Sequence, residues 1–430
     1  MQPGDLVRIE TKEKIYDGIL MPNSAKNVLF LKLGSGYNVG INVKSIKSKK
    51  VIKKGKKAVK RRQKRVVPKK GLKTVTILHS GGTIASAVDY ETGAVIARFT
   101  PEDLLGMFPE LKSIVNINSR LVGNMWSEDM RFAHYNILSK EVEKEVKKGV
   151  DGIIITHGTD TLHYTSAALA FALENLPIPV IIVGAQRSSD RGSSDAGMNL
   201  ICAANFIANT DFAGVAVCMH GSVSDDYCLI LPPTKVRKMH TSRRDAFKPI
   251  NVKPIAKVDI NGKVVFEKFI ECSRVDKSRK LVLKPFNEKL KVGFVKAHPQ
   301  MFASELDPYF KFNGLVLEGT GLGNMPFSVI DEHTKEHKRI KVKIKELANK
   351  IPVVMSSQTI FGRLQMNVYA KGRELQEAGV IGNYSDMTPE TTFIKLAWLL
   401  SNYPKEVKEL LLKDFRGEIS KRDLPEGYII

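Results

Sequence analysis

Two apolar runs, each ending in a glycine-bearing turn, constrain the fold of this chain more than any other feature. The run at 75–78 leads into Gly-Gly-Thr at 81–83, and the run at 152–155 leads into His-Gly-Thr at 157–159. Strands that are apolar on both faces are typical of a parallel sheet covered by helices. In such sheets ligands bind beyond the carboxyl ends of the strands, so both turns should open onto one crevice. Glycine lets the backbone approach a ligand, and a threonine hydroxyl can serve as a nucleophile once a base takes its proton.

From Leu72 onward, short apolar strands alternate with helical patterns, which indicates a doubly wound α/β sheet. The strand candidates are 74–79, 151–156, 179–184 and 214–219, with helical patterns at 127–148 and 162–173. After a polar, lysine-rich stretch at about 260–290, strand and helix patterns alternate again. The later candidates are strands at 291–295, 314–318 and 351–355 and a helix at 390–400. We therefore expect a second, smaller α/β domain.

The first fifty residues follow a different pattern, with short alternating stretches separated by turn signals. These stretches are 5–10, 16–20, 27–32 and 38–43. Four or five such strands predict a small SH3-like β-barrel over residues 1–52, a module typical of docking.

The net charge of +22 is concentrated in one segment rather than spread over the 430 residues. Sixteen Lys or Arg residues and no Asp or Glu lie between Lys44 and Lys73. Like charges this dense predict an extended basic linker over residues 53–71. It is either a solubilising lysine run or an arm that meets RNA phosphates, and the sequence leaves both readings open.

Several other classes of protein do not fit the sequence. No apolar run is long enough to span a membrane, and the N-terminus lacks the pattern of a signal peptide. The four cysteines lack metal-ligand spacing and read as reduced core residues, so a cytoplasmic protein is expected. Neither a P-loop nor a histidine metal motif occurs.

Three blocks together carry a resemblance to a known family. They are Gly-Gly-Thr-Ile-Ala at 81–85, His-Gly-Thr-Asp-Thr at 157–161, and Lys-Val-Arg-Lys-Met-His-Thr-Ser-Arg-Arg-Asp-Ala-Phe at 235–247. The first two resemble the paired threonine signatures of bacterial-type L-asparaginases, and the resemblance covers about 72–430. The third, in this longer form, resembles one branch, the D subunits of archaeal glutamyl-tRNA(Gln) amidotransferases, which also have a small N-terminal domain. The resemblance implies an asparaginase-like two-domain core, with a catalytic domain at 72–270 and a smaller C-terminal domain at 291–430.

The resemblance also assigns roles to individual residues. We expect Thr83 to be the nucleophile, while Thr159, Asp160 and Lys238 match the second threonine, aspartate and lysine of the asparaginase site. Which threonine attacks first stays open. Lys238 is preferred to Lys235 because a Lys-x-x-Thr pattern starts there, as in asparaginases.

Substrate contacts are carried over at fewer positions. Ser127 and Glu128 match the Ser-Gln segment that grips the substrate in asparaginases, with glutamate in place of glutamine. Tyr90 matches the lid tyrosine of the family. Asn324 lies in a turn that reaches the active site of a neighbouring protomer in asparaginases.

The resemblance implies a glutaminase component that releases ammonia from glutamine for a tRNA-dependent amidotransferase, a ligase of protein biosynthesis. A partner, the E subunit of the amidotransferase, would bind tRNA and use ATP and Mg²⁺ to convert Glu-tRNA(Gln) to Gln-tRNA(Gln). This chain would hold no cofactor or metal and would form a homodimer within a heterotetramer, without contact to a membrane. The alternatives are a free-standing cytoplasmic L-asparaginase and a non-catalytic RNA-binding scaffold.

Overall fold

The structure is a computed structural model of the chain. It describes residues 1–2, 4–21, 27–33, 38–54, 68–82, 84, 86–88, 95–97, 101–187, 193–267 and 272–428. Thr83, Tyr90 and most of the predicted basic linker lie outside these residues. Among the residues described, no helix combines the length and apolar character needed to cross a membrane.

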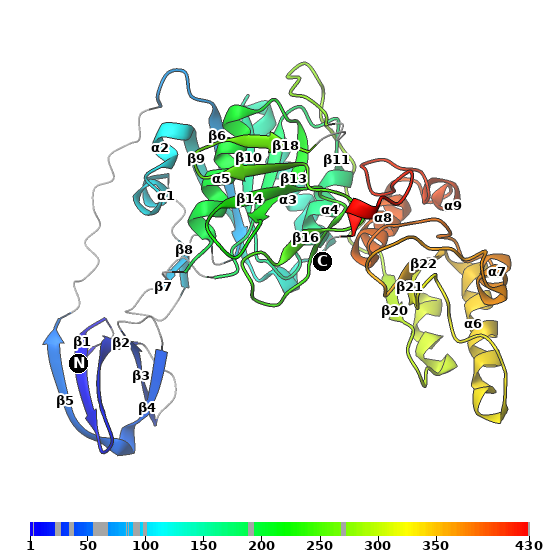
Figure 1. The fold of residues 1–430 in the computed structure, drawn as a ribbon, viewed down its shortest axis with the longest axis horizontal. Helices are drawn as coiled ribbons and strands as arrows, with labels where there is room; N and C mark the ends of the chain where they lie inside the picture. Colours follow the sequence, from blue (N-terminus) through cyan, green and yellow to red (C-terminus); the bar gives the residue numbers. More distant parts are fainter. Residues whose placement is uncertain are drawn as a thin grey trace.

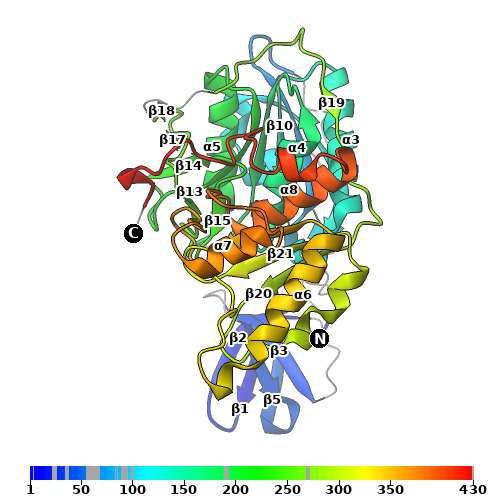
Figure 2. The ribbon, with the colours of Figure 1, turned by 90° about the vertical axis from the view of Figure 1, so that its right-hand side faces the viewer.

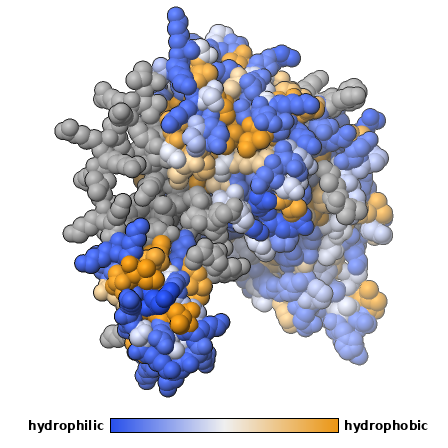
Figure 3. Space-filling view, turned by 60° about the vertical axis from the view of Figure 1, so that its left-hand side comes forward, coloured by the Kyte–Doolittle hydropathy of each residue, from blue (hydrophilic) through white to orange (hydrophobic). Residues whose placement is uncertain are grey.

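The N-terminal residues form a five-stranded antiparallel sheet in the order β4-β3-β2-β1-β5 (Figure 1). Its strands are β1 (Leu6–Thr11), β2 (Ile15–Leu20), β3 (Val28–Leu33), β4 (Asn38–Asn42) and β5 (Ile46–Lys53). Alternate residues such as Val7, Ile9 and Leu31 form a small core. The opposite face leaves Ile15 and Phe30 exposed, and Figure 3 shows apolar side chains gathered on this small domain.

The strand β5 is made of lysine-rich sequence that the alternation pattern did not single out. Its lysines are exposed at the edge of the sheet, while Ile46 and Val51 pack partly against the core. Exposed lysines on an edge strand oppose pairing with other chains, so charge and strand structure are compatible here.

The body of the chain contains an eight-stranded sheet in the order β18-β17-β14-β13-β12-β10-β6-β9 (Figure 1). Strands β13, β12, β10, β6 and β9 are parallel, and the other three pair antiparallel. The bounds are β6 (Thr74–Gly81), β9 (Asn116–Met125), β10 (Gly152–Thr156), β12 (Pro179–Val183), β13 (Gly214–His220), β14 (Tyr227–Leu231), β17 (Ala256–Asp259) and β18 (Val264–Phe266). The α/β fold predicted from the sequence is confirmed.

Helices cover both faces of this sheet, which explains why its central strands are apolar throughout. On one face Ile77 and Ile154 pack with α5 (Ala196–Asn209) and the short helices α1 (Pro101–Met107) and α2 (Leu111–Ile114). On the other face Ile153 and Ile155 pack with α3 (Phe132–Lys147) and α4 (Leu162–Ala172).

The predicted helical stretch at 127–148 begins later than its pattern suggested. Ser127–Asp129 form a single 3₁₀ turn, and α3 starts only at Phe132. Met130 and Arg131 are extended between the two elements, so a continuous helix is interrupted there. This break frees Ser127 and Glu128 to follow β9 as a turn.

The C-terminal part is a second, smaller α/β domain around a three-stranded parallel sheet (Figure 2). Its elements are β20 (Val292–Lys296), β21 (Gly314–Gly319), β22 (Val353–Ser357), α6 (Glu336–Lys350), α7 (Ala370–Glu377), α8 (Pro389–Asn402) and α9 (Val407–Leu410). Helix α8 packs between α4 and this sheet, and Phe171 of α4 stacks on Trp398 of α8 at 5.2 Å between ring centroids. The two domains therefore share a core.

Shorter elements complete the described chain. They are β7 (Ser86–Val88), β8 (Val95–Ala97), β11 (Leu173–Glu174), β15 (Val236–Lys238), β16 (Phe247–Pro249), β19 (Val282–Leu283) and the 3₁₀ turns at Val43–Ser45, Ala303–Lys311, Glu332–Thr334 and Pro425–Gly427.

Candidate active site

Three predicted site segments follow neighbouring parallel strands at one edge of the large sheet. Strand β6 lies between β9 and β10, and all three run in the same direction. Ser127 follows β9, Gly82 follows β6 and Thr159 follows β10. The three turns therefore meet at the carboxyl ends of these strands, where the sequence predicts a crevice.

The turns at this edge pack backbone against backbone. Gly82 has a φ of +80°, and a Cβ built on it would lie 2.8 Å from the carbonyl oxygen of His157 and from the nitrogen of Gly158. A Cβ on Gly158 would in turn lie 2.9 Å from the Cβ of Ser127. Glycine is needed at Gly82 both for its backbone angle and for this close approach.

A lysine from a separate hairpin completes the cluster. Lys238 ends β15, which pairs with β16, and its Nζ donates to Thr159 Oγ1 at 2.9 Å and to Asp160 Oδ1 at 2.6 Å. The side chain of Lys238 is 11% exposed, whereas that of Asp160 is 66% exposed. Asp160 thus faces solvent and any incoming ligand, and Lys238 lies behind it. The structure brings Thr159, Asp160 and Lys238 together as the sequence pattern suggested.

The other lysine of the block has a different environment. Lys235 is fully buried and donates to the carboxylate of Asp386 and, at 3.1 Å, to its carbonyl oxygen. Burial lowers the pKa of Lys235, and Asp386 opposes that shift. Lys235 therefore attaches the hairpin to the C-terminal domain, three residues before Lys238.

A second attachment of the hairpin was not predicted from the sequence. Arg237 lies 3.0 Å from the carboxylate of Glu390, which is buried in the first turn of α8. Burial raises the pKa of Glu390, and Arg237 opposes that shift. His163 of α4, also buried, lies 3.9 Å from the same carboxylate, and burial lowers its pKa to about 3. Glu390 lies in the first turn of α8, where a glutamate is common, so the sequence around it does not predict its contact with Arg237.

Ser127 and Glu128 lie beside the threonine turn. Ser127 is buried, its hydroxyl donates to Glu128 Oε2 at 3.3 Å, and its carbonyl accepts from Thr161 Oγ1 at 2.5 Å. Glu128 is exposed, as is the neighbouring Trp126. Their position suits contact with a ligand, and the substrate-binding role of Ser127 and Glu128 stays a prediction.

Of the remaining predicted residues, Asn324 lies in a turn of its own, and Thr83 and Tyr90 fall outside the described part of the chain. Asn324 closes the turn after β21 by exchanging backbone hydrogen bonds with Thr320. Among the described residues no hydrogen bond links it to Thr159 or Lys238, and its contact with a neighbouring protomer stays a prediction. Thr83, next to Gly82, and Tyr90 lie outside the described residues. No group of three His, Cys, Asp or Glu side chains suited to a metal ion occurs among the residues described.

The cluster has the groups that amide hydrolysis requires. A threonine hydroxyl 2.9 Å from an amine can pass its proton to that amine when the amine is neutral. An exposed carboxylate beside them can hold the ammonium group of an amino-acid substrate. Fold and cluster together define an amidohydrolase of the asparaginase class.

Comparisons with known proteins agree with this class and narrow it. The family model described as "Asparaginase, N-terminal" matches residues 74–270, "Glutaminase/Asparaginase C-terminal domain" matches 291–411, and "GatD N-terminal domain" matches 1–52. The L-asparaginase of Thermococcus kodakarensis superposes with a TM-score of 0.70 at 30% identity, covering 81% of this chain and all of that one. L-asparaginase I of Vibrio cholerae superposes with a TM-score of 0.68 at 26% identity, covering 81% of this chain and 99% of that one.

Relatives that match over nearly their whole length show which family this chain belongs to. The glutamyl-tRNA(Gln) amidotransferase D subunit of Pyrococcus furiosus is 45% identical, over 100% of this chain and 98% of its own length. The corresponding D subunit of Methanococcus maripaludis is 41% identical, over 98% of this chain and 99% of its own. The chain belongs to the family of glutamyl-tRNA(Gln) amidotransferase D subunits.

Proposed function

We propose that this chain is the glutaminase component of a tRNA-dependent amidotransferase, hydrolysing glutamine to glutamate and ammonia. The observation that carries the chemistry is the contact of Lys238 Nζ with both Thr159 Oγ1 and Asp160 Oδ1. The full-length similarity to D subunits favours this function over a free-standing asparaginase. The contacts that join Thr159, Asp160 and Lys238 favour it over a non-catalytic scaffold.

The geometry suggests how substrate binding could prepare the base. In the free site Lys238 Nζ donates to Asp160 Oδ1 as well as to Thr159 Oγ1. The α-ammonium group of an incoming glutamine would compete for the exposed Asp160. Once Asp160 turns to the substrate, Lys238 Nζ keeps its contact with Thr159 Oγ1 and is placed to take the hydroxyl proton during attack.

The covalent steps then follow the usual course of nucleophilic amide hydrolysis. A threonine oxygen, of Thr83 or Thr159, attacks the side-chain amide carbon and loses its proton. Ammonia leaves with that proton, an ester to glutamate remains, and water cleaves the ester to restore the hydroxyl. Released ammonia is useful only if an acceptor is ready, so hydrolysis should wait for the partner.

The partner and the assembly are part of the same proposal. We propose that the E subunit of the amidotransferase binds tRNA and uses ATP and Mg²⁺ to activate glutamyl-tRNA, while this chain supplies no nucleotide site. A homodimer of this chain would then form the centre of a heterotetramer, working in the cytoplasm.

The test is ammonia release from glutamine, and separately from asparagine, with and without the partner and glutamyl-tRNA. We expect weak hydrolysis by the isolated chain and much faster glutamine hydrolysis in the loaded complex, because closure of a site can set turnover. Rapid asparagine hydrolysis that ignores partner and tRNA would instead show a free-standing asparaginase.

Two variants test whether the chain is an enzyme or a non-catalytic scaffold. Lys238→Ala should reduce glutamine hydrolysis by orders of magnitude, since members of a catalytic relay act as a unit. Lys248→Ala, in β16 of the same hairpin and paired with Asp245, is the matched control and should keep most of the activity. Equal rates in both variants would remove Lys238 from the mechanism.

A further inference from the structure

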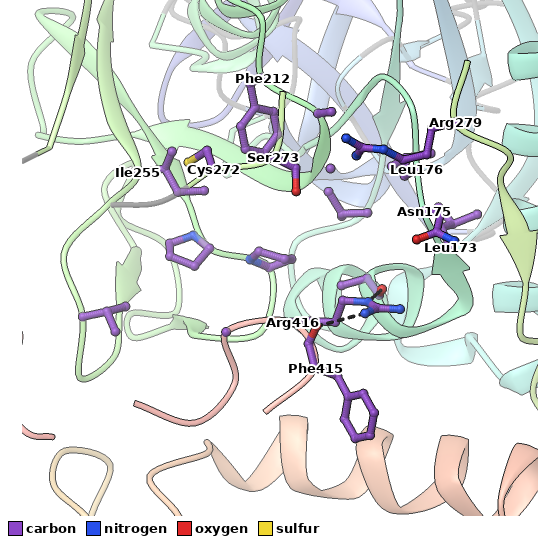
Figure 4. A pocket seen from close by; sticks show the side chains of 18 of the residues that line it. Leu173, Asn175, Leu176, Phe212, Ile255, Cys272, Ser273, Arg279, Phe415 and Arg416 are labelled. Carbon is purple, nitrogen blue, oxygen red and sulfur yellow. Dashed lines mark hydrogen bonds between the residues drawn. The ribbon is translucent and has the colours of Figure 1, made fainter. Parts of the chain in front are cut away.

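A cavity lies near the amino ends of the parallel strands, away from the cluster of Thr159, Asp160 and Lys238. Its volume is about 490 Å³, and its walls come from the end of α4, the start of β13, the segment that joins the two domains and the C-terminal tail (Figure 4). Gly214, at the amino end of β13, lines it, whereas Thr159 follows the carboxyl end of β10 in the same parallel set. The cavity is therefore separate from the crevice.

Three cationic side chains line this cavity, and among the described residues two of them form no close ion pair. Arg279, Arg416 and Lys253 are among its lining residues, and none of the described lining residues is acidic. Lys253 lies 3.9 Å from a carboxylate oxygen of Glu267. Neither Arg279 nor Arg416 forms an ion pair within the described part of the chain. Asp276 interacts electrostatically with Arg279 but is not among the lining residues, so two guanidinium groups line the cavity without an acidic lining residue, which favours an anion there.

Hydrogen bonds hold Arg416 in place in the wall of the cavity. Arg416 Nε donates to the carbonyl of Ala170 at 2.8 Å, near the end of α4, and Nη1 donates to the carbonyl of Phe415 at 2.9 Å. Its own backbone nitrogen donates to the carboxylate of Glu418, which is buried with Lys395. Arg416 thus offsets part of the negative end of the α4 dipole and keeps Nη2 for a ligand.

The rest of the cavity offers an apolar surface and one amide. Leu173, Leu176 and Phe212 are buried in its wall. Asn175 also lines the cavity (Figure 4), and its side-chain amide can add a hydrogen bond to a bound anion. Asn175 has a φ of +59°, a left-handed conformation that asparagine tolerates better than most residues.

We propose that this cavity binds a small organic anion, with a phosphate or carboxylate group between Arg279 and Arg416 and an apolar body against Leu173 and Leu176. The volume lies within the range of about 300–1,000 Å³ that is usual for small-molecule sites. Arg279 belongs to the segment between the domains and Arg416 to the C-terminal tail. A bound anion therefore joins two parts of the chain that are distant in sequence.

The experiment measures binding of three probes by ligand-observed NMR and by the shift in thermal midpoint. Phenyl phosphate and 3-phenylpropionate carry the two candidate anionic groups on the same aromatic body, and inorganic phosphate lacks the body. We expect one or both aromatic probes to bind more tightly than inorganic phosphate at millimolar concentrations, and their ranking identifies the anionic group. If the unaltered chain binds no probe at these concentrations, the proposal is wrong.

Variants locate the binding. Arg279→Gln should weaken binding about tenfold or more, the effect expected for loss of a charge-assisted hydrogen bond. Lys280→Gln, the exposed neighbour outside the cavity, makes the same charge change and should bind as the unaltered chain does. Ser273→Trp places bulk in the cavity without touching an arginine and should abolish binding. Equal affinities in Arg279→Gln and Lys280→Gln would overturn the proposal.

Two further measurements separate this cavity from other surfaces. Lys238→Ala should leave probe binding unchanged, because Lys238 lies in the crevice; a loss would place the probes there and overturn the proposal. Addition of the partner protein should also leave binding intact. Loss of binding in that complex would show that the cavity is a protein contact rather than a small-molecule site.

Discussion

Replacing Gly82 by alanine tests whether the close packing of the two glycine turns sets the catalytic geometry. Gly82 has a φ of +80°, and a Cβ built on it would lie 2.8 Å from three backbone atoms of His157 and Gly158. Gly149 offers a matched control, since its φ is +79° and a Cβ built on it would meet no atom within 4 Å. The two substitutions share the backbone strain and differ in the clash.

The magnitudes follow from these contacts. Alanine in the left-handed region costs roughly 1–2 kcal/mol, so this strain alone should lower the stability of both Gly149→Ala and Gly82→Ala by about that amount. At Gly82 the neighbouring turn must also retreat, because 2.8 Å falls about 0.6 Å short of the 3.4 Å at which ordinary contact begins. That turn carries Thr159 two residues after His157. A displacement approaching 1 Å can cost about a hundredfold in rate, so we expect Gly82→Ala to lose tenfold or more in kcat.

The assay compares glutamine hydrolysis by both variants in the complex with partner and glutamyl-tRNA, per mole of folded protein. Thermal midpoints measured alongside should fall in both variants, and further in Gly82→Ala, where the clash adds to the strain. Equal losses of kcat would mean that the effect comes from backbone strain and not from separation of the turns, which would refute this reasoning.

Three further predictions concern charge. Lys235→Met leaves the buried carboxylate of Asp386 without its cation and should destabilise the chain by about 3–5 kcal/mol. The loss should appear as increased proteolysis and hydrogen exchange at the hairpin, and protection like that of the unaltered chain would contradict this prediction. If the linker binds phosphates, replacing the basic residues of 53–65 with glutamine should weaken tRNA binding by the complex and reduce the dependence of its affinity on salt concentration. An unchanged salt dependence would show that the segment is only a solvated linker. Burial lowers the pKa of His157 to about 4 from an ordinary 6.5, so the folded state favours the neutral ring, and stability should be full above about pH 6.5 and fall as pH drops toward 4. Thermal midpoints across that range should show a shallower slope in His157→Asn, and an identical slope would exclude this histidine.

The elements around the crevice were predictable because their signals are local. Strands β6 and β10 are apolar runs that end at glycine turns, and the parallel sheet rule then places those ends together. The start of α3 was misplaced because the sequence from Ser127 onward suits a helix, whereas Met130 and Arg131 adopt extended backbone. The fifth strand of the small sheet was obscured by its lysines, which an edge position tolerates.

The contacts around the site were harder to predict from the sequence. Lys238 was identified from a short family pattern, and the hydrogen bond to Thr159 agrees with its placement. Lys235 and Asp386 are 151 residues apart, so no periodicity or spacing relates them. The cavity near Arg416 depends likewise on where the C-terminal tail lies, and only the tertiary structure provides that.

The attachment of the β15–β16 hairpin to the smaller domain limits how this enzyme can be divided. Lys238, the predicted catalytic lysine, belongs to the larger domain, yet the hairpin is held by Asp386 and Glu390 of the smaller one. A fragment that ends between the domains would keep Lys238 and lose both of these contacts. The two domains therefore have to be expressed and engineered together if the position of Lys238 is to be kept.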